Sequence, residues 1–257
     1  MALYALIGYP LSHSLSFRIN NAILNELGDF YIPFETQEGM LNRVVEALRV
    51  LSRGFNVTIP YKKSILVYLD EVSEEVRMIG AANAVKVFED RLLGYNTDYQ
   101  AIKKLSKDLQ GSSALIYGAG GAASASAYAL FSLGFKKFYI FNRTRDRAEA
   151  LAKRISLWGA KAEVVEGPVR ADVFVNATPL GMYYDDSQLL SFFRKGGYSS
   201  TIDLAYSLNG TNLQKASKVY VSGLDILIEQ AALSIEIWKG IAVDREKMRS
   251  VLREGKG

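Results

Sequence analysis

Cysteine is absent from this chain of 257 residues, and histidine occurs once, as His13. Without a thiolate the protein has no disulfide, no cysteine nucleophile, no iron–sulfur cluster and no zinc finger. A single histidine cannot form a multi-histidine site, so we expect no metal, and proton transfer falls to Lys, Asp, Glu or Tyr. Nothing in this composition points outside a reducing compartment, and we expect a cytoplasmic protein.

Neither sign of charge dominates, since 31 Lys and Arg residues face 27 Asp and Glu residues. The basic residues are scattered among acidic ones, which does not favour nucleic acid as a partner. The first ten residues lack the features of a signal peptide. Residues 111–135 carry no charge, but three glycines between 118 and 121 favour a buried strand, turn and helix over a membrane span. We therefore expect a soluble protein. Its sequence leaves open whether it is a monomer or a homodimer.

Short apolar runs alternate with amphipathic segments in the first part of the chain. The pattern predicts strands at residues 3–7, 31–34 and 55–59 and helices at residues 16–27, 40–51 and 62–69. Such alternation is typical of βαβ units and of a largely parallel sheet. A chain of this length buries roughly 70–75% of its unfolded surface, enough for one large or two small domains.

A second series of the same kind begins after a helix that opens at Asp98. It predicts strands at residues 114–117, 138–141, 162–165, 173–176, 201–204 and 219–221, with helices at residues 122–133 and 145–157. A last helix, residues 225–241, carries Leu227, Ala231, Ser234 and Trp238 along one stripe. The restart of the alternation predicts a domain boundary near Asp98.

A glycine-rich turn links the predicted strand at 114–117 to the helix that follows. Its sequence, Gly118-Ala-Gly120-Gly121-Ala122-Ala123, matches the G-x-G-x-x-A fingerprint of dinucleotide-binding folds in the required strand–turn–helix context. Gly118 permits the tight turn, Gly120 lets a pyrophosphate approach the backbone, and the helix N-terminus offers N–H groups to phosphate. The turn predicts a dinucleotide cofactor.

The segment after the next strand distinguishes between cofactors. NAD sites usually carry Asp or Glu there, whereas residues 142–147 read Asn-Arg-Thr-Arg-Asp-Arg. The arginines Arg143, Arg145 and Arg147 suit a 2′-phosphate, so we predict NADP. The alternative is a solvated basic loop with a helix cap at Thr144.

Small polar side chains gather in two segments of the first half. In the predicted strand 55–59, Phe55, Val57 and Ile59 face one side, while Asn56 and Thr58 face the other, near the carboxyl end and just before Lys62. Ser12 and Ser14 form a similar pair. These groups suit a small hydroxylated or carboxylated molecule, although the serines are equally suited to cap a helix. His13, between them, is expected to be structural.

Asp98 stands at the start of a predicted helix, where an acid can serve the helix alone. The same position would also suit an anionic partner for a catalytic lysine such as Lys62. The 36 residues between Lys62 and Asp98 leave both interpretations open.

Several of these segments, in this order, resemble the shikimate dehydrogenase family. The similar segments are Gly8–Ser16, Asn56–Lys62, Gly80–Ala84, Gly94–Asp98, Gly118–Ala122, Asn142–Arg147, Asn176–Met182, Asp203–Tyr206 and Gly223–Ala231. The resemblance implies an α/β fold of two domains. The first, residues 1–97 and 224–257, would bind substrate and carry catalysis, with the C-terminal helix returning to it. Residues 98–223 would form a Rossmann-type, doubly wound NADP domain.

The resemblance also implies roles for individual residues. Lys62 and Asp98 would be the catalytic pair, and the substrate would contact Ser12, Ser14, Thr58, Asn83, Asp98, Tyr206 and Gln230. The cofactor would contact Gly118, Ala119, Gly120, Gly121, Ala122, Asn142, Arg143, Thr144, Arg147, Thr178, Leu204 and Gly223. The expected reaction is reversible reduction of 3-dehydroshikimate to shikimate by NADPH in chorismate and aromatic amino-acid biosynthesis.

The chain departs from the family pattern beside these motifs. Phe17 and Asn20 replace a Pro and a His that are usual there, Ser124 replaces a frequent Arg, and residues 207–211 replace a Pro-Thr region. Two alternatives remain open: a quinate/shikimate dehydrogenase that uses NAD, and a non-catalytic ligand sensor on the same scaffold. The arginines after Asn142 oppose the first, and the presence of both Lys62 and Asp98 opposes the second.

Overall fold

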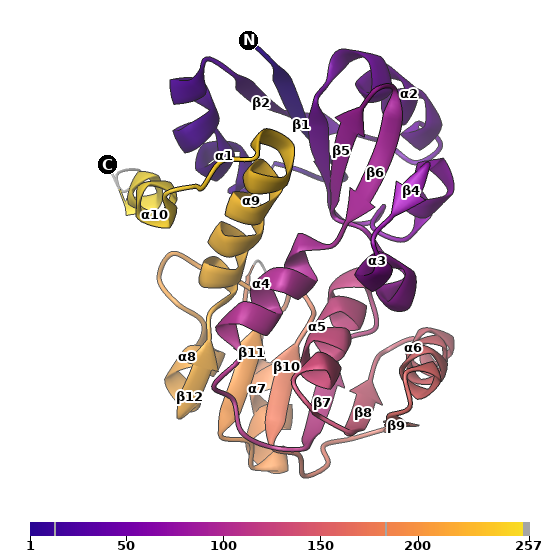
Figure 1. Ribbon diagram of the computed structural model, residues 1–257. Helices are drawn as coiled ribbons and strands as arrows, with labels where there is room; N and C mark the ends of the chain where they lie inside the picture. The colour runs from indigo at the N-terminus through magenta and orange to yellow at the C-terminus, as the bar shows by residue number, and fades with distance from the viewer. Residues whose placement is uncertain (13, 183, 254–257) are drawn as a thin grey trace. The chain divides into compact units, whose positions relative to one another are not determined.

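A computed structural model describes residues 1–12, 14–182 and 184–253. The chain divides into two compact units, each with its own six-stranded sheet (Figure 1). The first unit comprises Met1–Thr97 and the chain from Leu227 onward, and the second comprises Asp98–Ile226.

The sheet of the first unit is mixed, with the strand order β2-β1-β3-β5-β6-β4. Strand β1 is parallel to both β2 and β3, whereas β5 runs antiparallel to β3 and to β6. The strands are β1 (Leu3–Gly8), β2 (Phe30–Glu35), β3 (Gly54–Val57), β4 (Glu71–Val72), β5 (Ala84–Phe88) and β6 (Arg91–Tyr95).

The helices of the first unit come from both ends of the chain. Helix α1 packs against α10, and the Arg18 guanidinium donates to the carbonyl of Val251. The helices are α1 (Ser16–Leu24), η1 (Asn25–Leu27), α2 (Leu41–Leu51), η2 (Ser64–Tyr68), α3 (Glu74–Ile79), α9 (Gly223–Lys239) and α10 (Arg245–Arg253), where η marks a 3₁₀-helix. The residues of α9 before Leu227 belong to the second unit.

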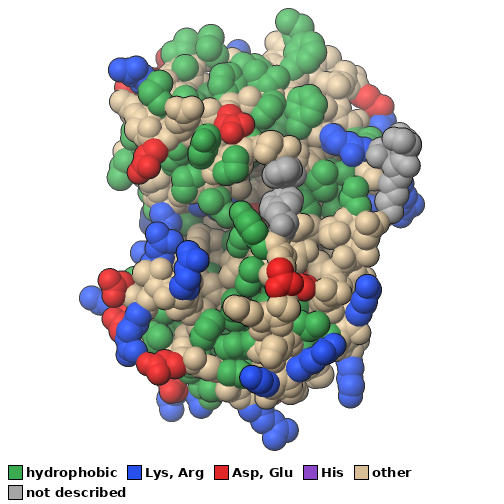
Figure 2. Space-filling model, turned by 180° about the vertical axis from the view of Figure 1, so that it is seen from behind, with side chains coloured by type: hydrophobic (Ala, Val, Ile, Leu, Met, Phe, Trp, Pro, Cys, Tyr) green, Lys and Arg blue, Asp and Glu red, His purple; other side chains and the backbone are tan. Residues whose placement is uncertain are grey.

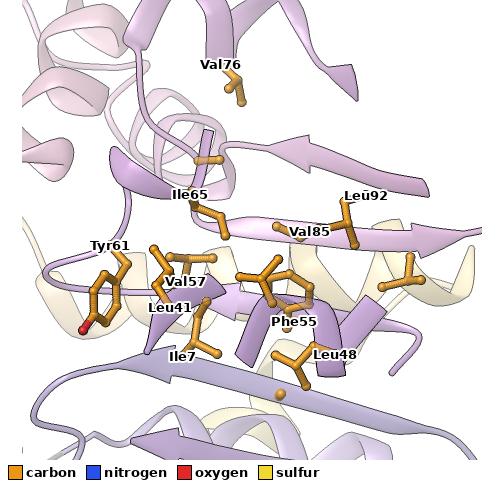
Figure 3. Close-up of a cluster of buried hydrophobic side chains, with 14 residues drawn as sticks. Ile7, Leu41, Leu48, Phe55, Val57, Tyr61, Ile65, Val76, Val85 and Leu92 are labelled. Atoms are coloured by element: carbon orange, nitrogen blue, oxygen red, sulfur yellow. The ribbon is translucent and has the colours of Figure 1, made fainter. Parts of the chain in front are cut away.

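One buried cluster fills the space between this sheet and α2 (Figure 3). Phe55 and Val57 of β3 project into it with Val85 of β5, and Leu41 and Leu48 of α2 close it. Because side chains alternate along a strand, Asn56 points to the opposite face. The alternation predicted for Phe55, Asn56 and Val57 is thus confirmed.

The sheet of the second unit is wholly parallel, with the order β12-β11-β10-β7-β8-β9. Its strands are β7 (Ser113–Tyr117), β8 (Lys137–Phe141), β9 (Lys161–Val164), β10 (Val173–Asn176), β11 (Ser200–Asp203) and β12 (Val219–Val221). Its helices are α4 (Thr97–Leu105), α5 (Gly121–Ser132), α6 (Arg145–Leu157), α7 (Ser187–Gly196) and α8 (Asn212–Ala216), the first residue of α4 belonging to the other unit. The strand order reverses between β7 and β10, which is the doubly wound topology predicted from the sequence.

Two expectations about the segment after β3 are wrong. Strand β3 ends at Val57, and Ile59 is 64% exposed instead of facing the core. The N–H of Tyr61 donates to the carbonyl of Thr58 (2.9 Å), so Ile59 lies within a turn and its side chain does not continue the alternation of the strand. The predicted helix at residues 62–69 is the shorter 3₁₀-helix η2.

The hairpin of β5 and β6 was not anticipated, and it makes the first sheet mixed where a largely parallel one was expected. Its turn contains Glu89 and Asp90, whose φ angles are 48° and 61°. Hairpin turns of this kind usually contain Asn-Gly or Asp-Gly, and this turn contains neither pair. Helices α3, α7, α8 and α10 and strand β4 were likewise not anticipated.

Gly54 is expected to be required for packing of Trp238. A Cβ at Gly54 would overlap three atoms of the Trp238 indole, whose Nε1 donates to the carbonyl of Val85 (2.9 Å). Gly54→Ala should therefore lower the free energy of unfolding by about 1–3 kcal/mol. Urea unfolding followed by Trp238 fluorescence in a Trp158→Phe background measures this. Gly167→Ala, where a Cβ meets nothing within 4 Å, should leave stability nearly unchanged; equal losses would contradict the prediction.

Asp172 should make the second unit sensitive to acid. Its Oδ2 accepts hydrogen bonds from the N–H groups of Ser112 and Ser113 and from the Ser113 hydroxyl, which hold the pKa of Asp172 below its ordinary value of 3.8. A lowered folded-state pKa gives stability that is present above 3.8 and is lost as the pH falls through the folded value. Chemical unfolding across pH 2–7 should show the stability gap between wild type and Asp172→Asn narrowing below about pH 4. A gap that stays constant would exclude this contribution.

Candidate functional site

Two backbone hydrogen bonds place the end of β1 beside the segment that follows β3. The N–H of Thr58 donates to the carbonyl of Ile7, and the N–H of Tyr9 donates to the carbonyl of Ile59, both at 2.9 Å. The loop with Ser12 and Ser14 therefore begins next to Thr58, as a shared site requires.

The two serines differ in their surroundings. Ser12 is exposed, whereas Ser14 is half-buried and its Oγ accepts from the N–H of Ser16, the first residue of α1 (3.3 Å). Leu15 holds the N-cap position, so neither serine is the capping residue. His13 lies outside the described residues.

The side-chain amide of Asn83 connects the predicted substrate residues with the start of α4. Its Oδ1 accepts from the N–H of Thr97 (2.7 Å), and its Nδ2 donates to Thr97 Oγ1 (2.9 Å) and to Gln230 Oε1 (3.3 Å). Asn83 is 2% exposed and Gln230 is 8% exposed. The structure thus brings Asn83 of the first half of the chain together with Gln230 of α9.

The backbone of Lys62 borders this network, and Asp98 follows one of its members along the chain. The carbonyl of Lys62 accepts from the N–H of Ala82, the neighbour of Asn83 (2.9 Å). Asp98 follows Thr97 directly and stands in the first turn of α4, where a carboxylate stabilises the helix through its dipole. Both Lys62 and Asp98 are half-buried.

Ser234 also belongs to this network, although its sequence position placed it only on the stripe of the last helix and not in the site. Its Oγ accepts from Asn56 Nδ2 (2.9 Å), donates to the carbonyl of Gln230 (2.8 Å) and lies 3.2 Å from Thr97 Oγ1. Asn56 in turn accepts from the Tyr31 hydroxyl (2.9 Å), and burial raises the pKa of Tyr31, which keeps that proton in place. A polar residue on the apolar stripe of α9 was the available signal.

In the second unit, the glycine-rich turn has the shape that a phosphate-bearing cofactor needs. Gly118 has φ +120°, and a Cβ there would lie 2.9 Å from the carbonyl oxygen of Ala177. A Cβ at Gly120 would meet nothing within 4 Å, so open space borders the turn. Gly120 is the N-cap of α5 without a side-chain hydrogen bond, and no acid stands in the first turn of α5, formed by Gly121, Ala122 and their successors. The residues therefore fit a dinucleotide.

Backbone hydrogen bonds collect the other predicted cofactor residues at the same edge of the sheet. Gly118 N donates to the carbonyl of Phe141, next to Asn142 (2.8 Å). Leu204 N donates to the carbonyl of Asn176 (2.9 Å), and the side chain of Asn176 accepts from the N–H and Oγ1 of Thr178 (3.1 and 2.7 Å). The carboxyl ends of β7, β8, β10 and β11 thus meet here, at the edge where open α/β sheets bind ligands. Ala119 is buried within the turn, Gly223 begins α9 and Tyr206 is half-buried in the loop after Leu204.

The arginines after β8 do not share one role. Arg145 pairs with Glu149 (2.8 Å) and Glu166 (3.1 Å). Arg143 and Arg147 are exposed on either side of it, and Asn142 Nδ2 donates to the carbonyl of Thr144 (2.8 Å), the N-cap residue of α6. Only Arg143 and Arg147 therefore remain as candidates for a 2′-phosphate.

The rest of the described surface was considered for further binding sites. On the face shown in Figure 2, Lys and Arg side chains lie in separate groups with acidic and hydrophobic side chains between them. A shallow hollow beside α7 is lined by residues that include Pro168, Phe192 and Lys195, and by none of the predicted site residues. Of the helices in the described part of the chain, none combines the length and the apolar character needed to cross a bilayer.

Family models match three parts of the chain. Residues 6–85 match the shikimate dehydrogenase substrate binding domain, residues 100–180 match shikimate / quinate 5-dehydrogenase, and residues 223–253 match the shikimate 5'-dehydrogenase C-terminal domain. These segments contain most of the site residues described above.

Whole-chain relatives agree with these matches. The NADP(+) shikimate dehydrogenase of Pyrobaculum islandicum is 37% identical, covering 98% of both chains, and that of Bacillus subtilis is 37% identical, covering 97% of this chain and 96% of its own. The crystal structure of the Thermus thermophilus shikimate 5-dehydrogenase with NADP(H) and shikimate has a TM-score of 0.83 at 33% identity and covers 99% of each chain. By its sequence and its fold, the chain belongs to the shikimate dehydrogenase family.

Proposed function

We propose that this protein is an NADP-dependent oxidoreductase that reversibly reduces 3-dehydroshikimate to shikimate in chorismate and aromatic amino-acid biosynthesis. The observation that carries the proposal is the buried network around Asn83, which ties the backbone of Lys62 to the residue before Asp98. The relatives named as NADP(+) shikimate dehydrogenases support the substrate and the cofactor.

The substrate carries one carboxylate and several hydroxyls, and the residues proposed to bind it match those groups. Ser12 and Ser14 donate hydroxyl hydrogen bonds to the carboxylate. Thr58, Asn83, Tyr206 and Gln230 provide hydroxyl and amide groups, which both donate and accept and therefore suit ring hydroxyls.

Lys62 and Asp98 serve as the catalytic pair in this proposal. When bound, the nicotinamide cofactor supplies or takes up the hydride. The Lys62 ammonium donates its proton to the carbonyl oxygen as negative charge develops there, and takes the proton back from the hydroxyl in the reverse direction. The Asp98 carboxylate orients the ammonium. A histidine is unnecessary, because an ordinary lysine is protonated at neutral pH.

The cofactor's phosphates are proposed to bind at the turn from Gly118 to Ala122. Arg143 and Arg147, with Asn142 and Thr144, are proposed to hold the 2′-phosphate, and Thr178, Leu204 and Gly223 to line the nicotinamide side. Because Arg145 already neutralises two acids, it is left out of this set.

Replacing Lys62 should remove chemistry more than binding. We expect Lys62→Ala to lower kcat by about 10²–10⁴-fold, because the general acid is lost, with little change in the Kd of shikimate. The rate of NADP reduction with shikimate and isothermal titration measure the two effects. Lys63→Ala, the exposed neighbouring lysine, is the matched control and should keep its kcat. Near-normal turnover by Lys62→Ala would refute the assignment, and a wild type inactive with shikimate would favour the ligand sensor.

The arginines should decide between cofactors. Arg143→Ala with Arg147→Ala should lower kcat/KM for NADPH by about 10- to 100-fold, because charge-assisted hydrogen bonds to the 2′-phosphate are lost, and should leave kcat/KM for NADH nearly unchanged. Arg145→Ala is the control and should affect both cofactors little. Rates with 3-dehydroshikimate and with dehydroquinate, each with NADPH and NADH, test the quinate alternative in the same assay. Equal losses with both cofactors would argue against a 2′-phosphate contact.

A further inference from the structure

A buried carboxylate in the second unit has no part in the function proposed so far. Asp203, the last residue of β11, is 0% exposed and accepts four hydrogen bonds. Its Oδ1 accepts from Asn176 Nδ2 (2.8 Å) and from the N–H of Ala205 (3.1 Å). Its Oδ2 accepts from the hydroxyls of Thr211 (2.7 Å) and Tyr220 (3.0 Å). All four donors are neutral groups.

Burying a carboxylate costs more free energy than burying an apolar residue in the same space. Burial raises the pKa of Asp203, and the hydrogen bonds from Thr211, Asn176, Tyr220 and Ala205 oppose that shift. A buried carboxylate without a cation persists only where donors surround it, and an apolar residue would fill the space at lower cost. The four donors therefore define what Asp203 does, which is to hold the segments that carry them.

The first of these segments is the loop that contains Tyr206. Ala205 and Thr211, at its two ends, both bond to the Asp203 carboxylate, so the loop is closed onto one side chain. Inside the loop, Gly210 N donates to the carbonyl of Ser207 (3.1 Å). Thr211 is also the N-cap of α8, accepting from Gln214 N (3.3 Å), which fixes the far end of the loop.

The second segment follows the neighbouring strand, β10. Asn176 gives its Nδ2 to Asp203 and uses its Oδ1 to accept from the backbone and hydroxyl of Thr178. Asp203 is thus hydrogen-bonded directly to the proposed substrate loop. It is linked to the proposed cofactor residue Thr178 by two hydrogen bonds in series, through Asn176.

We infer that Asp203 is a positioning residue that acts through Tyr206 on the substrate and through Asn176 and Thr178 on the cofactor. This inference rests on the proposed function, which places Tyr206 on the substrate. Because Asp203 is buried, we assign it no direct contact with either ligand.

The kinetic test compares Asp203→Asn with Tyr206→Phe and with the double variant, using shikimate and NADP. Asp203→Asn should raise the KM of shikimate by about 10-fold or more, and the loss of kcat/KM in the double variant should be smaller than the product of the single losses, because both remove the same contact. Asp172→Asn is the matched control, a carboxylate with three hydrogen-bond donors in the same unit, just before β10. The fold-loss of kcat/KM caused by Asp172→Asn should multiply with the fold-loss caused by Tyr206→Phe when the two substitutions are combined. Multiplicative losses for Asp203→Asn would overturn the inference.

A second measurement does not depend on the substrate. Hydrogen exchange of the free protein should show faster exchange of residues 205–211 in Asp203→Asn, with residues 112–117 unchanged, and the reverse in Asp172→Asn. Unchanged exchange at 205–211 would also overturn the inference. If the wild type does not oxidise shikimate, the proposed function fails, while the exchange data still decide whether Asp203 anchors the loop. If Asp203→Asn does not fold, Tyr220→Phe, which removes one donor, carries both tests with smaller effects of the same sign.

Discussion

The pair of hydrogen bonds between Asn83 and Thr97 is the interaction on which the first unit's proposed chemistry depends. Both residues are almost fully buried, and each satisfies the other's polar groups, so neither can be removed without leaving a buried donor or acceptor unpaired. The pair fixes the backbone at the point where α4 begins, one residue before Asp98. It also orients the amide that bonds Gln230, so a structural network and a set of proposed substrate contacts share the same atoms.

In the second unit, a buried carboxylate holds the loops that follow the strands. Parallel strands end at a common edge, and the loops that leave them start there. Asp203 supplies hydrogen-bond partners to three segments, through Asn176, Ala205 and the hydroxyls of Thr211 and Tyr220. In both units, the side chain that holds the loops is buried: Asn83 is uncharged, and both carboxylate oxygens of Asp203 accept hydrogen bonds. Such satisfied buried groups hold the loops in place.

The arginines of the chain differ in role according to the acidic residues that they pair with. Arg145 pairs with Glu149 and Glu166, and Arg143 and Arg147 are therefore the arginines proposed to hold a phosphate. Arg245, the first residue of α10, pairs with Glu229 and Glu236 of α9 and so attaches the C-terminal helix to the first unit. A basic residue near a motif is therefore a candidate for ligand binding only after its acidic neighbours have been considered.

The sequence by itself determined the features that arise locally. Strand β7, the turn at Gly118 and helix α5 follow from an apolar run, a positive φ that favours glycine and a helical period, all within residues 113–132. The antiparallel pairing of β5 with β3 and the partners of Arg145, Asn83 and Asp203 were decided only by the tertiary structure. Asn83 and Gln230 are 147 residues apart, and Asp203 meets Asn176 from 27 residues away. Contacts at such separations leave no periodic trace in a sequence, because packing, and not local backbone preference, brings the partners together.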